Sequence, residues 1–316
     1  MLNENQKLAV EHYLGPCLTI APPGSGKTKC LVERVVHLIT VHHIKPDKIL
    51  VVTFTKDAAC EMKERFCKEF TSDGGMPFFG TFHSLFFHIL KVEGYYSSKD
   101  IIQSSVAYAF MKQALLECKI SKKDVLPFTV IKEISRCINL NMSYSDYISN
   151  TLEDQFEKVA TFYKSLMEQK HLIDFDDMMI KVYELFLKDN DLRLKWQKKF
   201  DFILLDEMQD INELQFEIIK LLLQEEQNIF AVGDDDQSIY EFRGSKPDIM
   251  LNFQKSFKNT AIVKLNINYR SLRQIITAAN CLINKNVHRF QKDCRCFLNQ
   301  YGSIHYLQFE NEAKQA

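Results

Sequence analysis

The 316-residue sequence has no strong excess of charge of either sign, no long apolar run and no leader-like start. Its 40 basic and 41 acidic side chains give a net charge of −1, which excludes a global positive field that attracts nucleic acid. Nucleic-acid binding would therefore depend on local grooves and base stacking. No apolar run reaches the roughly 18 residues of a membrane span, and residues 1–6 contain no basic or apolar signal segment. We expect a soluble, cytoplasmic protein without a membrane partner.

The nine cysteines are an odd number and form no obvious metal-ligand pattern. We expect reduced thiols, because the sequence shows no signal peptide. Cys294 and Cys296 form a CxC pair, but the second pair or neighbouring histidines of a typical zinc site are missing. The rest of the composition, with 46% apolar and 26% charged residues, is ordinary for a globular protein, and the length favours two or three domains.

Short apolar runs alternate with helical patterns in two blocks of the chain. The runs predict buried strands at 16–21, 49–54, 202–205, 229–232 and 261–265. Helical spacing follows the first two runs, at 27–39 and 58–70. This alternation indicates an α/β fold with a largely parallel, doubly wound sheet and helices on both faces.

Residues 86–197 interrupt the alternation. Their spacing is helical, glycines are few and no convincing buried strand occurs. We therefore predict a helical insertion subdomain at 86–197, inserted into one α/β domain made of 1–85 and 198–265.

The segment APPGSGKT at 21–28 lies between a predicted strand and a predicted helix, where a phosphate-binding loop belongs. Its glycines let backbone N–H groups face the phosphates, and the helix N-terminus adds positive potential. Lys27 would reach the β- and γ-phosphates of ATP, and the hydroxyl of Thr28 would bind Mg²⁺. Only Ala21 departs from the general pattern, which begins with glycine.

Two carboxylates end the predicted strand at 202–205. Asp206 would hold Mg²⁺ through water, and Glu207 would orient and deprotonate the attacking water. Solvated acids at the end of a strand are the ordinary alternative. A phosphate-binding loop in the same sheet favours the catalytic interpretation.

The segment GDDDQSIYEFRG at 233–244 emerges from the carboxyl end of another predicted strand, the edge at which open α/β sheets bind ligands. Gln237 offers an amide to a phosphate. Tyr240, Phe242 and Arg243 offer flat faces to bases. We predict that this segment couples a nucleotide to a nucleic-acid strand.

Eight motifs, taken in order, resemble those of the UvrD/Rep-like family of superfamily 1 helicases. They are LNENQ at 2–6, APPGSGKT at 21–28, TFTKDAA at 53–59, GTFHS at 80–84, IDFDDM at 173–178, DEMQD at 206–210, GDDDQSIYEFRG at 233–244 and NYRS at 268–271. That family often has alanine at the first position of the loop, which accounts for Ala21. The resemblance implies a P-loop (RecA-like) motor domain that binds ATP and Mg²⁺. It also implies that hydrolysis drives 3′ to 5′ movement on single-stranded DNA.

The resemblance also implies a role for each matching residue. The implied catalytic residues are Lys27, Asp206, Glu207, Gln237 (a γ-phosphate sensor) and Arg270 (an arginine finger). The implied nucleotide-binding residues are Gln6 (reading adenine), Ala21, Pro22, Pro23, Gly24, Ser25, Gly26, Lys27, Thr28, Tyr269 (stacking on adenine) and Arg34 (near Tyr269). The implied metal ligands are Thr28 and Asp206. The implied single-strand contacts are Phe54, His83, Tyr240, Phe242 and Arg243.

Two departures from the family weaken these expectations. Phe242 stands where the family usually has tryptophan, so stacking there is expected to be weaker. A lone aromatic residue could instead pack in the core, and this alternative applies most strongly to Phe54. Nothing like motifs V and VI follows residue 271, so 266–316 would be only the start of a truncated second motor domain.

These departures lead to two hypotheses and a weaker third. An incomplete motor would bind ATP with Mg²⁺, turn it over slowly or not at all, and bind single-stranded DNA weakly. A partner protein could then supply or replace the missing half. Alternatively, the chain is a helicase-like nucleotide-binding switch subunit of a repair or anti-phage defence complex, without unwinding activity of its own. A simple P-loop kinase is disfavoured by Gln237, Arg243, Tyr269 and Arg270.

Overall fold

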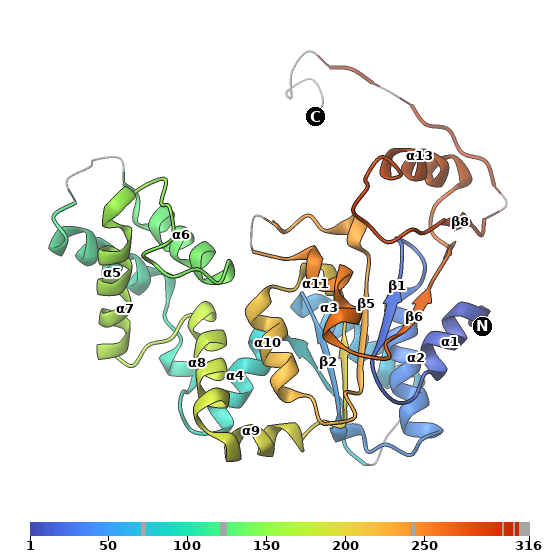
Figure 1. Cartoon of the computed structure of the whole chain (residues 1–316), viewed down its shortest axis with the longest axis horizontal. Helices are drawn as coiled ribbons and strands as arrows, with labels where there is room; N and C mark the ends of the chain where they lie inside the picture. The colour runs from blue at the N-terminus through green and yellow to red at the C-terminus, as the bar shows by residue number, and fades with distance from the viewer. Residues whose placement is uncertain (71–73, 121–124, 242–243, 299, 306, 310–316) are drawn as a thin grey trace.

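A single parallel sheet organises the chain in the computed structural model, which describes residues 1–70, 74–120, 125–241, 244–298, 300–305 and 307–309. Its strand order is β3-β2-β4-β5-β1-β6, and every neighbouring pair runs parallel (Figure 1). The strands are β1 (Cys17–Ile20), β2 (Ile49–Thr53), β3 (Phe78–Thr81), β4 (Phe202–Leu205), β5 (Ile229–Gly233) and β6 (Ala261–Lys264). The predicted α/β class with a parallel sheet is confirmed.

Helices cover both faces of this sheet and also form a separate group. They are α1 (Glu4–Glu11), α2 (Lys27–Thr40), α3 (Lys56–Glu69), α4 (Phe82–Val92), α5 (Ser104–Glu117), α6 (Pro127–Asn139), α7 (Phe156–Gln169), α8 (Phe175–Lys188), α9 (Asn190–Gln197), α10 (Glu213–Leu222), α11 (Pro247–Leu251), α12 (Phe253–Ser256) and α13 (Arg273–Ile283). Among the described residues, no helix is both long and apolar enough to cross a membrane.

The alternation of side chains along the strands produces two cores. Successive residues of a strand point to opposite faces, so Leu18 and Ile20 pack on one side of the sheet and Cys17 on the other. The first face is covered mainly by α4, α8, α9 and α10, and the second by α1, α2 and α3. Strands β1, β2, β4 and β5 are buried along their whole length. Continuous apolar runs are therefore what a sheet covered on both faces requires.

Helices α5, α6 and α7 form a third core of their own, away from the sheet (Figure 1). Phe156 and Tyr163 of α7 are buried against Met111 of α5 and Val130 of α6. Helices α8 and α9 lie within the predicted insertion, yet Met178 and Trp196 belong to the core that faces the sheet. The division of the chain at 86–197 therefore stays a prediction about domains, while packing separates α5–α7 from the rest.

The chain after β6 crosses the carboxyl end of β1. Leu265 N donates to Ile20 O at 2.8 Å, and four residues later Tyr269 N donates to Gly24 O at 2.9 Å. Strand β7 (Ile267–Asn268) then pairs with β8 (Arg295–Cys296), and α13 lies between them in the sequence. This region therefore begins directly above the predicted phosphate-binding loop.

Candidate nucleotide and nucleic-acid site

The loop between β1 and α2 has the backbone conformation of a phosphate cradle. Gly24 and Gly26 have φ values of 69° and 88°, the left-handed region that favours glycine. Ser25 is buried, and its N–H and hydroxyl both bond Pro22 O, at 3.2 and 2.6 Å, which closes the turn. Lys27 and Thr28 open α2, so the positive end of the helix dipole faces the loop.

An ion pair joins this loop to the end of β4. Lys27 Nζ lies 2.9 Å from Glu207 Oε2. Glu207 itself adopts a left-handed backbone (φ 49°, ψ 49°), which turns its side chain back toward the loop. Gln209 Nε2 bonds the same carboxylate oxygen at 2.9 Å, and Gln209 Oε1 accepts from Asp234 N at 2.9 Å. The ends of β1, β4 and β5 are therefore connected by one polar network.

Asp206 has the features of a metal ligand. It is 5% exposed, and Thr53 Oγ1 donates to its Oδ2 at 3.3 Å. Its Oδ1 is buried and finds no hydrogen-bond partner among the described residues. Burial, together with the neighbouring Glu207 charge, raises the pKa of Asp206 to about 7. An orphaned carboxylate oxygen at the strand tip fits a cation such as Mg²⁺, whose charge would favour the ionised form.

The NYRS segment packs directly on the phosphate-binding loop. Asn268 Nδ2 donates to Pro23 O at 2.7 Å, and Asn268 Oδ1 accepts from the backbone N–H of Arg270 at 2.8 Å. A Cβ on Gly24 would lie only 2.8 Å from Arg270 Cβ and from Asn268 Oδ1. Arg270 is exposed, and its Cβ lies against Gly24 of the loop.

The predicted adenine side of the site is held together through α1. Gln6 Nε2 donates to Ser25 O at 2.9 Å, and Asn3 caps α1 through a reciprocal pair with Gln6. Asn3 Nδ2 also donates to the Tyr269 hydroxyl at 2.8 Å. Gln6, the loop and Tyr269 are thus brought together as the sequence motifs predict, and their roles toward adenine stay predictions.

Arg34 lies elsewhere. Its side chain is 2% exposed, and its guanidinium donates to Ala9 O at 3.2 Å, to Val10 O at 3.3 Å and to His12 O. The same group lies 4.6 Å above the ring of Phe230. These carbonyls end α1, where backbone acceptors lack partners within the helix. We therefore assign Arg34 to holding α1, and correct its predicted place beside Tyr269.

Gln237 lies in a 3₁₀ turn, Asp235–Gln237, directly after β5. Its Nε2 donates to Asp234 Oδ2 at 2.6 Å. Asp234 is fully buried at the end of the strand. The predicted sensor is thus anchored to the strand and not to the surface loop that follows it.

Aromatic side chains gather at the carboxyl ends of neighbouring strands. Phe54 follows β2 and stacks on Tyr240, with ring centroids 5.1 Å apart and planes 23° apart. His83, in the first turn of α4, meets Phe175 edge to face at 5.5 Å. Burial lowers the pKa of His83, so the ring is neutral near pH 7. Phe242 and Arg243, also predicted to contact the strand, lie outside the described residues.

The IDFDDM motif begins α8. Asp174 and Asp177 form its capping box, and both bond Lys164 of α7, at 2.8 and 2.7 Å. This cluster holds α7 against α8. Phe175, in contrast, is 60% exposed and faces His83. Phe175 has no role among the predicted site residues, although three carboxylates, those of Asp174, Asp176 and Asp177, flank this aromatic side chain in the sequence.

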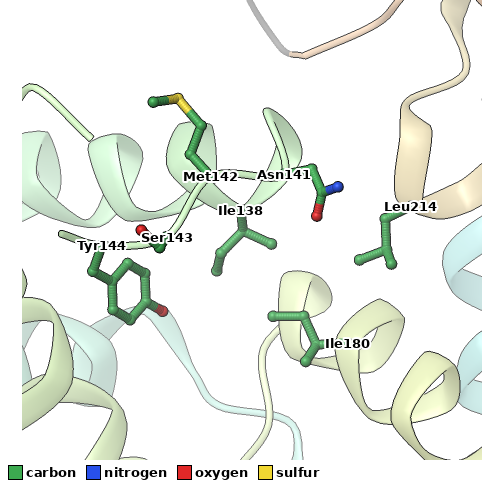
Figure 2. A pocket seen from close by; sticks show the side chains of 7 residues that line it. All are labelled: Ile138, Asn141, Met142, Ser143, Tyr144, Ile180 and Leu214. Atoms are coloured by element: carbon green, nitrogen blue, oxygen red, sulfur yellow. The ribbon is translucent and has the colours of Figure 1, made fainter. Parts of the chain in front are cut away.

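A cavity of about 240 Å³ lies apart from these residues, where α6 meets α8 and α10. Figure 2 shows Ile138, Ile180 and Leu214 pointing into it, with the turn at 141–144 along one side. Its lining contains no titratable group except Tyr144. The cavity therefore has none of the charges that a nucleoside triphosphate requires, and no predicted site residue lines it.

The comparisons with known proteins agree with this arrangement. Residues 2–258 match the model of the UvrD/REP helicase N-terminal domain, whose fold is RecA-like. The chain is 38% identical over 304 residues to a probable DNA helicase II homolog of Mycoplasma capricolum, covering 93% of this chain and 42% of that protein. It is 39% identical to the putative ATP-dependent DNA helicase YjcD of Bacillus subtilis, covering 92% of this chain and 39% of that protein. With the ATP-dependent DNA helicase Rep of Escherichia coli the identity is 33%, covering all of this chain and 48% of Rep.

The chain thus spans half or less of the length of these relatives. The family match covers β1–β5 together with the phosphate-binding loop, Asp206, Glu207 and Gln237. The ordered motifs, the parallel sheet and these matches lead to one conclusion: the chain belongs to the UvrD/REP helicase family, and its residues 2–258 correspond to the N-terminal domain of that family.

Proposed function

We propose that the chain is the N-terminal motor portion of an ATP-dependent DNA helicase. In this proposal ATP hydrolysis with Mg²⁺ is coupled to 3′ to 5′ movement on single-stranded DNA. One observation supports it above others: a single sheet edge holds the Lys27–Glu207 pair and the Phe54–Tyr240 stack. The segment that follows β5 is connected to both: Asp234 N bonds Gln209, which bonds Glu207, and Tyr240 stacks on Phe54.

ATP would bind across the loop and the NYRS segment. Phosphate oxygens would accept hydrogen bonds from the backbone N–H groups of residues 24–28. The ammonium group of Lys27 would leave Glu207 and bind the β- and γ-phosphates. Gln6 donates one amide N–H to Ser25 O, and its Oε1 accepts one hydrogen bond from Asn3 N. A second N–H and a second lone pair on Oε1 would be available to an adenine edge. Tyr269 would supply the stacking face.

Residues of this chain would prepare the attacking water. Once Lys27 has moved to the phosphates, Glu207 Oε2 becomes available to accept a proton from water. Asp206 and the Thr28 hydroxyl would hold Mg²⁺, which supplies charge neutralisation for the transferring phosphoryl group. Arg270 would add a second positive charge from the opposite side of the loop.

A DNA strand would run along the aromatic groups. The stack of Phe54 on Tyr240 and the exposed ring of Phe175 beside His83 present flat faces without a large positive charge. Base stacking of this kind contributes about 1–3 kcal/mol per base and tolerates any sequence. This mode of binding is compatible with the net charge of −1.

Nucleotide binding and turnover test the first half of the proposal. The binding of a fluorescent ATP analogue and phosphate release are measured with and without oligo-dT. Lys27→Ala is expected to abolish both, whereas Lys99→Ala, an exposed lysine outside the site, leaves both unchanged. If oligo-dT stimulates ATP turnover and Gln237→Ala reduces it, a motor is supported. If the chain binds the ATP analogue but oligo-dT does not stimulate turnover, the switch subunit is supported. Phosphate transferred to a small acceptor supports a kinase and contradicts the proposal.

Fluorescence anisotropy of labelled oligo-dT tests the second half. Phe54→Ala and Phe175→Ala are each expected to weaken binding about 5- to 150-fold, from about 1–3 kcal/mol of lost stacking. Phe128→Ala, an aromatic residue of α6 that is 49% exposed, is the matched control and leaves binding unchanged. Direction is measured by displacement of streptavidin from either oligonucleotide end. Displacement from the 3′ end only would contradict the proposed polarity.

A specific observation also favours a covering partner. Leu282, Val287, Phe297 and Tyr301, all after β6, are 62–93% exposed. These four exposed apolar side chains belong to one stretch of the sequence, 282–301, and exposed apolar surface is typical of an interface. We propose that a protein segment which completes the second motor half covers them, whether it belongs to the same polypeptide or to a partner subunit. Size-exclusion chromatography of Leu282→Asp and Val287→Asp variants with a candidate partner would test this, since retained association would refute it.

A further inference from the structure

Three consecutive aspartates follow β5, and two basic residues from the segment after α13 surround them. Lys292 Nζ contacts Asp234 Oδ1, Asp235 Oδ1 at 2.5 Å and Asp236 Oδ2 at 3.0 Å. Arg289 binds both oxygens of Asp236, at 2.8 and 2.6 Å. The side chains of Lys292 and Arg289 are only 6% and 3% exposed.

The two basic side chains reduce the electrostatic repulsion among the three carboxylates of the turn. Three adjacent carboxylates carry a charge of −3, and Lys292 and Arg289 together carry +2, so the cluster keeps −1. Buried like charges repel strongly unless cations lie among them. Lys292 is the cation that touches all three, and Phe290 N adds a hydrogen bond to Asp235 Oδ2 at 2.9 Å.

Asp234 in turn fixes the side chain of Gln237. A carboxylate only accepts hydrogen bonds, so the Gln237 atom at 2.6 Å from Asp234 Oδ2 must be the NH₂ group. This settles which way the amide faces. It leaves the second N–H of Gln237 for a phosphate oxygen and its carbonyl oxygen for a water molecule.

We propose that Lys292 is a positioning residue for the nucleotide sensor, acting on Gln237 through the carboxylate of Asp234. The inference rests on the proposed role of Gln237 at the γ-phosphate. Lys292 holds Asp234 Oδ1, and Asp234 Oδ2 holds Gln237, so one carboxylate joins the two. Lys292 does not touch the nucleotide.

The consequence is a direct connection between the region after β6 and the ATP site. Asp234 N bonds Gln209, which bonds Glu207, which pairs with Lys27. A displacement of the segment at 289–292 would remove Lys292 from Asp234 and leave the carboxylate that holds Gln237 without its cation. The position of the second domain would therefore set whether the chain distinguishes ATP from ADP.

The test compares the affinity of this chain for a non-hydrolysable ATP analogue with its affinity for ADP, by fluorescence titration. Lys292→Met keeps the side-chain length but removes the charge and the donors. We expect it to lower the preference for the triphosphate about tenfold, the order typical of a residue that orients another, and to leave ADP affinity unchanged. Lys285→Met, an exposed lysine just after α13, is the matched control and keeps the full preference.

A double-mutant cycle separates positioning from a structural effect. In the Gln237→Ala background, Lys292→Met is expected to change the preference no further. An undiminished effect there, or no effect of Lys292→Met alone, overturns the inference while Gln237 keeps its role. If Gln237→Ala itself leaves the preference unchanged, the proposed sensor and the inference fall together. If melting shows that Lys292→Met does not fold, Lys292→Gln enters the same cycle.

Discussion

Replacement of Arg34 by leucine tests the corrected role of this residue most directly. The guanidinium is the hydrogen-bond donor for carbonyls in the last turn of α1 and just beyond it, of which Ala9 and Val10 are buried. Burial lowers the pKa of Arg34 to about 10, so the group is still charged at neutral pH. Each buried carbonyl left without a donor costs about 1–3 kcal/mol, so two cost about 2–6 kcal/mol.

Hydrogen exchange of the α1 peptide, read by mass spectrometry, measures this loss locally. A central value of about 4 kcal/mol corresponds to nearly a thousandfold faster exchange, at 1.4 kcal/mol per factor of ten. Arg34→Lys keeps the charge but offers a more compact donor, so its α1 exchange rate is expected to lie between those of the unchanged protein and Arg34→Leu. Arg65→Leu is the control, because its pair with Glu61 is exposed and contributes little. A change below about 25-fold in Arg34→Leu, which corresponds to the lower bound of about 2 kcal/mol, would refute the carbonyl argument.

Three further predictions concern the site and its supports. Gly24→Ala is expected to lower nucleotide affinity and melting temperature, because its Cβ would lie only 2.8 Å from atoms of Arg270 and Asn268. Gly94 has a similar φ (76°) but open space around it, so Gly94→Ala is the control. Equal losses in the two variants would contradict the packing argument. Asp206, with its pKa raised to about 7 from an ordinary 3.8, binds a proton in the folded state that the unfolded state has lost, so stability falls as pH rises between those values. Metal-free melting curves from about pH 5 to 7.5 should show this fall, and a slope unchanged in Asp206→Asn would exclude Asp206 as its source. Lys164→Met leaves Asp174 and Asp177 without their cation and is expected to lower the free energy of unfolding in a denaturant titration by about 3–5 kcal/mol. Lys181→Met, at an exposed pair with Glu168, is the control and is expected to lower it by under about 1 kcal/mol. Equal losses would show that the buried cluster is not stabilising.

The sequence predicts the buried parts of the sheet well, because strands covered on both faces are continuous apolar runs. The predicted run at 202–205 matches β4, and the run at 229–232 misses only Gly233 of β5. Strand β3 was not predicted. Its four residues, Phe78–Thr81, include a glycine and are only partly buried, so they lack an apolar run that can be recognised. The pair β7–β8 is two residues long on each side, which is too short for any periodicity.

The candidate site is predictable where chemistry demands a fixed spacing. Lys27 and Glu207 are 180 residues apart in the chain, yet each follows a strand, and parallel neighbours bring such ends to one edge. Arg34 shows the limit of this reasoning, since spacing along α2 does not reveal which face α1 covers. Lys292 shows another limit: it belongs to no motif, and only the fold brings it to Asp234.

The short path from the sheet to the NYRS segment has a mechanical consequence. Leu265 is still bonded to β1, and Tyr269 is already bonded to the phosphate-binding loop. Four residues span at most about 14 Å when fully extended, so there is little slack between them. The region that contains α13 is therefore joined to the sheet directly beside the phosphate-binding loop, through a short segment that is bonded at both ends. A small rotation at residues 265–269 would therefore displace the far end of α13 by a larger distance, as the end of a lever moves farther than its pivot.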